Sequence, residues 1–206
     1  MEAPKVILSE AERLLIRDAN IILTKNSSIE KISNQFGLAA AVYQRQCESL
    51  KVKYPELFNI HPKISKGEKH NGLPWIMLDY PRSFDKETGQ FAIRTFFWWG
   101  NFFSIQLQVS KYYLPFFVKA LPNWQVNKIE WMTGFTNDAW DMQLPNPLWR
   151  NIENSNIPDT NNETLVLKLA KKIPIELWEN SEMNFSKDYG ELVELMTIAL
   201  SAQPVK

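Results

Sequence analysis

The segment FFWWGNFF, residues 96–103, places six aromatic side chains in eight positions. It lies inside the longer stretch FAIRTFFWWGNFFSIQLQVS, which exceeds the roughly 3–10 residues of an ordinary strand. The Gly100-Asn101 pair between two apolar runs suits a two-residue hairpin turn, because the first turn position favours a positive φ. The segment therefore predicts the tip of a β-hairpin.

This two-residue turn also predicts which side chains share a face, because side chains alternate along each strand. Trp99 is expected to pair with Phe102, and Trp98 with Phe103. One face is then apolar apart from Arg94, and it carries Ala92, Arg94, Phe96, Trp98, Phe103, Ile105, Leu107 and Val109. The other face is polar at its base and has Phe97, Trp99 and Phe102 at its tip. A slip of one residue in the turn would change these faces.

The residues before the hairpin show helical patterns. Ser9 with Glu12 and Ser27 with Glu30 each fit a capping box, and apolar residues then recur three or four positions apart. We expect one helix over about 10–25, with Asn26 as its stop, and a second that ends before Pro55. The short connection between them predicts an antiparallel helical hairpin over about 9–54.

A sheet-rich body is expected over about 62–178. Asn71-Gly72 marks a turn before the strand PWIMLDY, and Pro81 predicts that this strand lies at an edge or ends at a bulge. The remaining elements are a tight turn at DKETG, a helix over 110–121, strands over 124–132 and 163–170, a third strand at IPIELW, and a final helix over about 187–202. A long loop rich in Asn, Asp and Pro covers 134–162. Together they indicate one α+β domain, residues 1–206, with a mostly antiparallel sheet.

The composition argues against several classes of partner. Lys plus Arg equals Asp plus Glu at 23 each, so no net positive charge favours nucleic acid. No apolar run reaches the roughly 18 residues of a membrane helix, and the start of the chain lacks the pattern of a signal peptide. The single cysteine, Cys47, cannot form an internal disulfide. We therefore expect a cytoplasmic protein that binds neither membrane nor nucleic acid.

The sequence contains no recognisable catalytic motif, which leaves open whether the protein is an enzyme. His61, His70 and Cys47 do not form a zinc pattern, and Asp138 with Asp141 in a loop is more typical of turns than of a metal site, so we expect no metal and no cofactor. Ser28-Ile-Glu-Lys31 matches the Ser-x-x-Lys pattern of some acyl-transfer enzymes, but the partner motifs are missing and helix capping accounts for these residues. An enzyme would need Asp79, Asp138, Asp141 or Glu130 to converge on one cleft.

Arg94 has three interpretations. It can form an ion pair with Asp79 or Glu130 that ties strands together, because an unpaired buried charge is very costly. It can lie near the sheet edge with a buried stem and its guanidinium group in water. It can also hold the carboxylate or another anionic group of a ligand, since the guanidinium group matches such groups in shape.

The aromatic excess, 13% of the chain, also has several explanations: core packing, a ligand site or a partner surface. Because rings fall on both faces of the hairpin, the second face must be covered by a helix, a ligand or another chain. We predict an aromatic-lined site for a small organic ligand beside the hairpin, formed by Arg94, Asp79, Phe97, Trp99, Phe102 and Trp75. The alternative is an interaction or self-assembly module, such as a homodimer, that uses the aromatic tip.

Overall fold

The computed structural model describes residues 6–126, 130–138 and 164–204, together with positions 128, 144, 149, 150, 160 and 162. Its α-helices are α1 (Glu10–Arg17), α2 (Ala19–Gln46), α3 (Glu48–Lys53), α4 (Pro55–Phe58), α5 (Leu114–Gln125) and α6 (Ser181–Ser201). Its strands are β1 (Lys63–His70), β2 (Leu73–Asp85), β3 (Gly89–Trp98), β4 (Phe102–Ser110), β5 (Met132–Thr136), β6 (Trp149–Arg150) and β7 (Val166–Ile173). The 3₁₀ segments in the described part of the chain are η1 (Lys111–Tyr113) and η3 (Ile175–Asn180).

The strands in the described part of the chain form one sheet in the order β1-β2-β3-β4-β7-β5-β6, and every pair of neighbours is antiparallel. The first four strands follow one another as a meander. The last strand in sequence, β7, lies between β4 and β5. The predicted α+β class with a mostly antiparallel sheet, preceded by helices and followed by a C-terminal helix, is confirmed.

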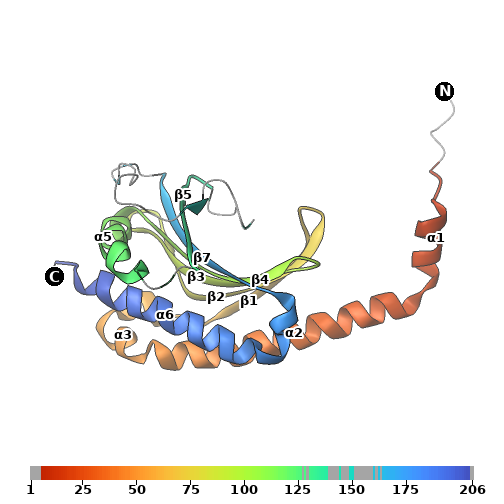
Figure 1. Ribbon diagram of the computed structural model, residues 1–206, viewed down its shortest axis with the longest axis horizontal. Helices are drawn as coiled ribbons and strands as arrows, with labels where there is room; N and C mark the ends of the chain where they lie inside the picture. Colours follow the sequence, from red (N-terminus) through yellow and green to blue (C-terminus); the bar gives the residue numbers. More distant parts are fainter. Residues whose placement is uncertain are drawn as a thin grey trace.

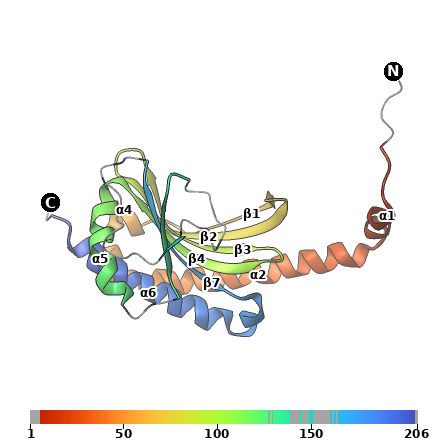
Figure 2. The ribbon, with the colours of Figure 1, turned by 45° about the horizontal axis from the view of Figure 1, so that its top comes forward.

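The sheet is curved, and α2 and α6 lie side by side on one of its faces (Figures 1 and 2). This face carries the apolar side chains of the central strands, including Ile76 and Leu78 of β2, Phe91, Ile93 and Phe97 of β3, Phe103, Ile105 and Leu107 of β4, and Leu167 and Leu169 of β7. They pack against the apolar faces of the helices, with Phe36 and Tyr43 of α2 and Phe185, Tyr189 and Leu192 of α6. The main core therefore lies between the sheet and the helices.

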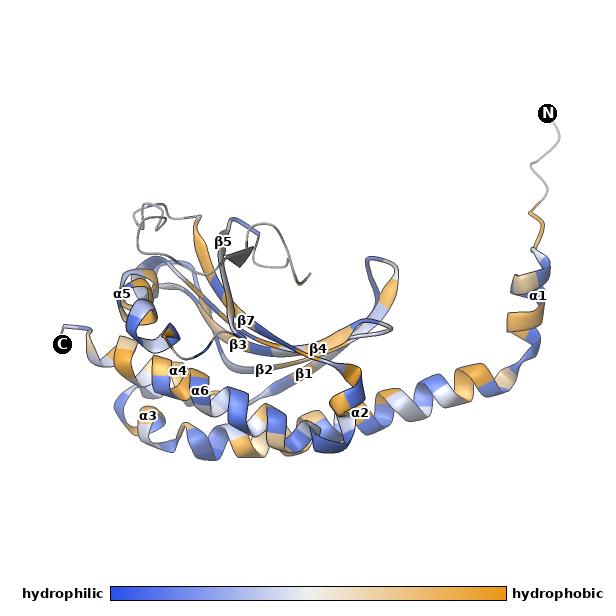
Figure 3. Ribbon diagram, in the orientation of Figure 1, coloured by the Kyte–Doolittle hydropathy of each residue, from blue (hydrophilic) through white to orange (hydrophobic). Residues whose placement is uncertain are grey.

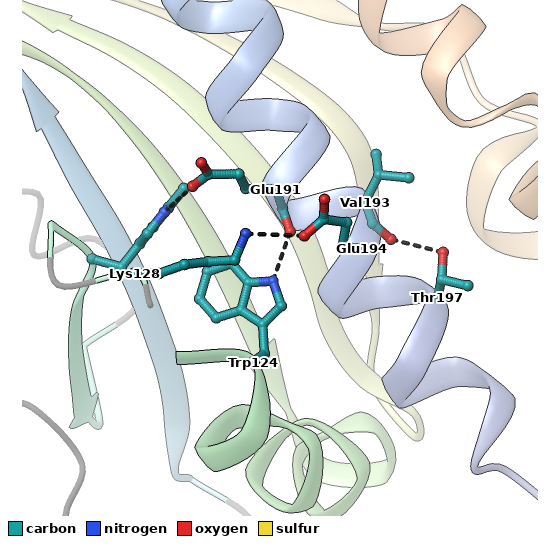
Figure 4. A network of polar contacts seen from close by, with 7 residues as sticks. Trp124, Lys128, Glu191, Val193, Glu194 and Thr197 are labelled. Atoms are coloured by element: carbon teal, nitrogen blue, oxygen red, sulfur yellow. Dashed lines mark hydrogen bonds and ion pairs between the residues drawn. The ribbon is translucent and has the colours of Figure 1, made fainter. Parts of the chain in front are cut away.

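A second set of contacts holds the end of α5 against α6. The indole nitrogen of Trp124 donates to the backbone oxygen of Glu191 at 2.9 Å, and Lys128 forms an ion pair with Glu194 at 2.9 Å (Figure 4). The Lys128 ammonium group also lies 5.0 Å from the centre of the Trp124 ring, a cation–π distance. The Trp131 indole donates to the Glu191 carboxylate at 2.6 Å. These contacts fix the chain where it passes from α5 towards β5.

The N-terminal helices differ from the prediction. The capping box of Ser9 and Glu12 is present, but the chain leaves the helix at Asp18, whose carboxylate accepts from the backbone N–H of Asn20 and so begins α2. Helix α2 then continues through Asn26 without a break, because a helix interior tolerates polar residues and the Ser28 hydroxyl donates to Thr24 O inside the helix. The predicted antiparallel packing is wrong, since α1 buries no residue and points away from the body (Figure 1).

The register of the central hairpin also differs. Trp98 pairs with Phe102, and Phe97 pairs with Phe103, so the turn has three residues, 99–101, in place of two. Gly100 has the positive φ that the sequence predicted, at 70°. The extra turn residue moves Phe97 to the face of Phe103, and Phe102 to the face of Arg94. The assignment of residues to shared faces is therefore corrected by one position along β4.

Two predicted turns are confirmed, and the strand between them is partly as expected. Asn71 and Gly72, with φ of 48° and 82°, join β1 to β2, although the polar residues of β1 gave no strand signal. Asp85 accepts from two backbone N–H groups of the DKETG turn, those of Glu87 and Thr88. Strand β2 runs through Pro81 at a register shift between Asp79 and Arg82, as predicted for a bulge, but β2 is an inner strand.

Several later boundaries differ from the predictions. The helix predicted over 110–121 is α5, which begins four residues later, with Pro115 in its first turn. The strand predicted over 124–132 is wrong, since helix α5 extends to Gln125 and β5 begins at Met132. IPIELW is not a separate strand, because its first residue, Ile173, ends β7 and its last four residues belong to η3, whereas the predicted strand at 163–170 corresponds to β7. Most of the long loop at 134–162, including Trp140 and Asp141, lies outside the described residues.

Candidate functional site

A hollow of about 330 Å³ lies where α2, the tip of the β3–β4 hairpin and η3 meet. Helix α2 contributes Ser28, Lys31 and Ile32, the hairpin contributes Phe97, Trp99, Gly100 and Phe103, and η3 contributes Ile175 and Trp178. These three segments are distant in sequence. The hollow is therefore a product of the tertiary fold and opens beside the aromatic segment.

The aromatic walls of the hollow support one another. The Phe97 and Phe103 ring centres are 4.9 Å apart, and Trp178 stacks on Phe103 with centres 5.8 Å apart and an angle of 25°. Trp99 meets Phe97 edge to face at 6.0 Å. Such arrangements are favourable for aromatic pairs. Because Phe97 and Phe103 are almost fully buried, the walls are held in place without a ligand.

Polar groups of the hollow come from α2. Lys31 is exposed and forms no ion pair within the described part of the chain. The Ser28 hydroxyl donates to Thr24 O at 2.9 Å, so its oxygen can accept a further hydrogen bond. The hollow thus combines an apolar, aromatic interior with one cationic side chain at its rim.

The opposite face of the sheet carries a buried polar layer. Arg94 and Asp79 are cross-strand partners, and the Arg94 Nε lies 3.3 Å from the Asp79 carboxylate. The Arg94 guanidinium group also lies 5.5 Å from the centre of the Phe84 ring. Burial raises the pKa of Asp79, and the positive charge of Arg94 opposes this shift. Of the three interpretations of Arg94, the ion pair with Asp79 is the arrangement found, while Glu130 pairs with Lys171.

The structure does not bring the six predicted site residues together. Phe97 and Trp99 line the hollow on the helix side of the sheet. Asp79 and Arg94 lie on the opposite face, as do Trp75, which packs near Phe96, and Phe102, which packs with residues such as Ala170. Two physical reasons account for this: the three-residue turn places Phe102 on the other face from Phe97, and the alternation of side chains along β3 places Arg94, with its cross-strand partner Asp79, on the other face from Phe97.

Seven residues that line the hollow were absent from the predicted site: Ser28, Lys31, Ile32, Gly100, Phe103, Ile175 and Trp178. Ile32 and Phe103 fit the core pattern of their elements, and Lys31 matched only the Ser-x-x-Lys pattern. Trp178 lies in the segment that we expected to be a strand. No spacing in the sequence links these positions, because they meet only when α2 and η3 pack beside the hairpin.

The described residues offer little support for metal or thiol chemistry. Within the described ranges, no three His, Cys, Asp or Glu side chains lie close enough together to hold a metal ion. Cys47 is fully buried, its sulfur lies 3.1 Å from the Tyr189 hydroxyl, and burial raises the pKa of the thiol to about 12. Such a thiol is unreactive at neutral pH. Of the helices within the described ranges, none has both the length and the apolar character needed to cross a bilayer.

Comparisons with protein-family models, with curated proteins and with solved structures found no match to this chain. The function is therefore inferred from the residues and geometry of the molecule.

Proposed function

We propose that the protein binds a small organic anion with an aromatic or aliphatic body in the hollow between α2, the β3–β4 turn and η3. The observation that carries this proposal is an apolar hollow of about 330 Å³ lined by the exposed Lys31, which forms no ion pair with any residue that the structure describes. Ligand sites in proteins have volumes of roughly 300–1,000 Å³ and combine apolar walls with few polar groups. The volume suits a molecule of one or two rings or a short chain.

The walls favour a flat or apolar body. Phe97, Phe103 and Trp178 present ring surfaces that contact one another at centre distances of 4.9 Å and 5.8 Å. A ligand ring can stack on such surfaces, and its burial removes apolar area from water. Because the rings are already fixed by their neighbours, little side-chain entropy is lost on binding.

Lys31 takes the role that the sequence suggested for Arg94. Arg94 is buried beside Asp79 on one face of the sheet, whereas Phe97 lies on the opposite face. Lys31 is exposed beside the aromatic walls, so its ammonium group can hold a carboxylate, sulfonate or phosphate at the mouth of the hollow.

The alternative, a partner surface formed by the hairpin tip, has less support. Phe97, Phe102 and Phe103 are each at most 5% exposed, so they offer little area to a second protein. Trp98 and Trp99 remain half-buried. If the tip were an assembly surface, Trp99→Ala would lower the oligomeric mass, whereas the ligand proposal predicts that the mass stays unchanged.

Binding can be tested with two fluorescent probes of the same shape. One is 1-anilinonaphthalene-8-sulfonate, which is anionic, and the other is N-phenyl-1-naphthylamine, which lacks the sulfonate. We expect Lys31→Met to lower the affinity for the anionic probe about five- to tenfold and to leave the affinity for the neutral probe nearly unchanged. We expect Trp178→Ala to lower the affinity for both probes about tenfold, because this change removes one aromatic wall of the hollow. Native mass spectrometry of protein from its own cells would then identify a natural ligand by its added mass.

Matched controls are available elsewhere on the surface. Lys53→Met removes an exposed lysine of α3, and Trp75→Ala removes a half-buried tryptophan on the opposite sheet face. Neither change should alter either affinity. If both probes bind Trp178→Ala as tightly as the unchanged protein, the hollow is not the binding site and the proposal is wrong.

A further inference from the structure

The N-terminal arm, defined as residues 6–24, carries an apolar surface that is exposed among the residues the structure describes. Helix α1 has no buried residue, and Lys25, which follows the arm in α2, forms an ion pair with Glu68 of β1 at 2.6 Å. Burial in α2 begins only at Ile32. The arm therefore projects from the body (Figure 1), and apolar residues run along α1 and the start of α2 (Figure 3).

The exposed side chains of the arm are large and aliphatic. They are Val6, Ile7, Leu8, Leu14, Leu15, Ile16, Ile21, Ile22 and Leu23, with exposed fractions from 44% to 95%. At roughly 100 Å² each, they offer on the order of 900 Å² of apolar surface. A stable protein interface buries about 800 Å² per partner, which is comparable with the total apolar area that the arm exposes.

The charges of the arm argue against a lipid surface. The arm holds three acidic residues, Glu10, Glu12 and Asp18, and two basic residues, Arg13 and Arg17. Helices that lie on anionic membranes have polar faces rich in Lys and Arg. A net charge of −1 gives no such attraction.

The positions of the charges match a second copy of the same arm. Glu12 is used in the capping box, and Arg13 donates to Leu8 O, whereas Glu10 and Arg17 form no ion pair with any described residue. Glu10, Leu14 and Arg17 are four and three residues apart, so they lie on one face of α1. In an antiparallel pair of α1 helices, Glu10 of each copy would face Arg17 of the other, with Leu14 at the centre.

We infer that the protein forms a homodimer in which the N-terminal arms of two copies pack antiparallel and cover each other. Each interface carries the same residues on both sides, as a two-fold axis requires. Two Glu10–Arg17 ion pairs set the orientation, and the aliphatic side chains of α1 and the start of α2 supply the buried area. The bodies remain on either side of the arms, and the hollow beside Lys31 stays accessible.

A charge exchange tests both the interface and its orientation. Glu10→Arg makes the arm basic at both positions, and Arg17→Glu makes it acidic at both, so each variant alone repels its own copy. We expect each variant to dimerise at least tenfold more weakly than the unchanged chain, as measured by sedimentation. A 1:1 mixture of the two variants should form a heterodimer, because opposite charges then meet at both positions.

An apolar variant and a control complete the experiment. The double change Leu14→Glu with Ile22→Glu should give a monomer of 24.0 kDa with an unchanged circular dichroism spectrum, since both side chains are more than half exposed, at 62% and 52%. Leu38→Glu changes a residue of α2 outside the arm with a similar exposed fraction, 56%, and should leave the dimer intact. The inference is overturned if the unchanged chain is a monomer, if the arm variants still dimerise, or if a monomer instead floats with vesicles of phosphatidylcholine and phosphatidylglycerol.

Discussion

At the scale of single residues, the contact between α2 and α6 depends on a few buried polar groups among rings. Tyr43 of α2 and Tyr189 of α6 stack with ring centres 3.7 Å apart. The Tyr43 hydroxyl hydrogen-bonds to Thr95 at 2.9 Å, and the Tyr189 hydroxyl lies beside Cys47. Each polar atom thus has a partner in the core, which removes the cost of burying it.

The raised pKa values of two buried groups, Cys47 and Tyr80, predict that the protein loses stability at alkaline pH. Burial raises the pKa of Cys47 from 9.0 to about 12, and the pKa of Tyr80 from 10.0 to about 12. Between these values the unfolded chain releases protons that the folded chain keeps, so stability is complete below about pH 9 and falls as the pH rises. Each fully titrating group contributes about 1.4 kcal/mol per pH unit. Urea unfolding across this pH range should show that the free energy of unfolding falls less steeply with pH in Cys47→Ala than in the unchanged protein. Equal slopes in the two proteins would mean that Cys47 does not contribute to the alkaline loss of stability.

At the scale of elements, two glycine turns hold the meander together in different ways. Gly89, the first residue of β3, has φ of 90° and lies against the backbone of Ser110, whose hydroxyl accepts from the N–H of Gln90 at 2.8 Å. Gly100, in the β3–β4 turn, has φ of 70° and open space around it. Both positions require a left-handed backbone, but only Gly89 also requires the absence of a side chain.

The two glycines should therefore respond differently to the same change. Gly100→Ala is expected to lower the free energy of unfolding by about 1–2 kcal/mol, from backbone strain alone. Gly89→Ala is expected to cost about 1–3 kcal/mol more, because its new carbon would lie 2.9 Å from the Ser110 carbonyl oxygen. Urea unfolding of both variants provides the comparison, and equal losses would show that packing at Gly89 is unimportant.

At the scale of the whole molecule, Lys171 connects the sheet to the helix layer. Its ammonium group lies 2.8 Å from the Asp188 carboxylate of α6 and also pairs with Glu130. Asp188 is almost fully buried, with its side chain 3% exposed, whereas that of Glu130 is 67% exposed. Burial raises the pKa of Asp188, and Lys171 opposes this shift. Only the contact with Asp188 therefore compensates for a buried charge.

Removing Lys171 should leave that charge without compensation. We expect Lys171→Met to lower the free energy of unfolding at neutral pH by about 3 kcal/mol, and Glu130→Gln to lower it by less than about 1 kcal/mol. The loss in Lys171→Met should be smaller at mildly acidic pH than at neutral pH, because burial raises the pKa of Asp188 and the carboxylate then takes up a proton in the folded state. Chemical denaturation at the two pH values tests both statements. A loss that does not depend on pH would mean that Asp188 is not the group responsible.

Much of the local structure could be predicted from sequence because local rules govern it. The capping residues Ser9 and Glu12 begin α1, Asn71-Gly72 and the DKETG segment form turns, and Pro81 lies at a bulge. The aromatic run around Gly100 forms a hairpin tip. In each case the deciding interaction involves residues only a few positions apart, so the pattern of residue types is sufficient.

The candidate site depended on choices that no local rule makes. A three-residue turn in place of a two-residue turn separates Phe97 from Phe102, and both turns are compatible with Gly100-Asn101. Lys31, Phe103 and Trp178 become neighbours only because α2 and η3 pack against the hairpin. The sequence by itself thus determined the α+β class, the turns and most of the longer helices and strands, while the tertiary packing decided register, faces and the hollow, because those depend on contacts between distant segments.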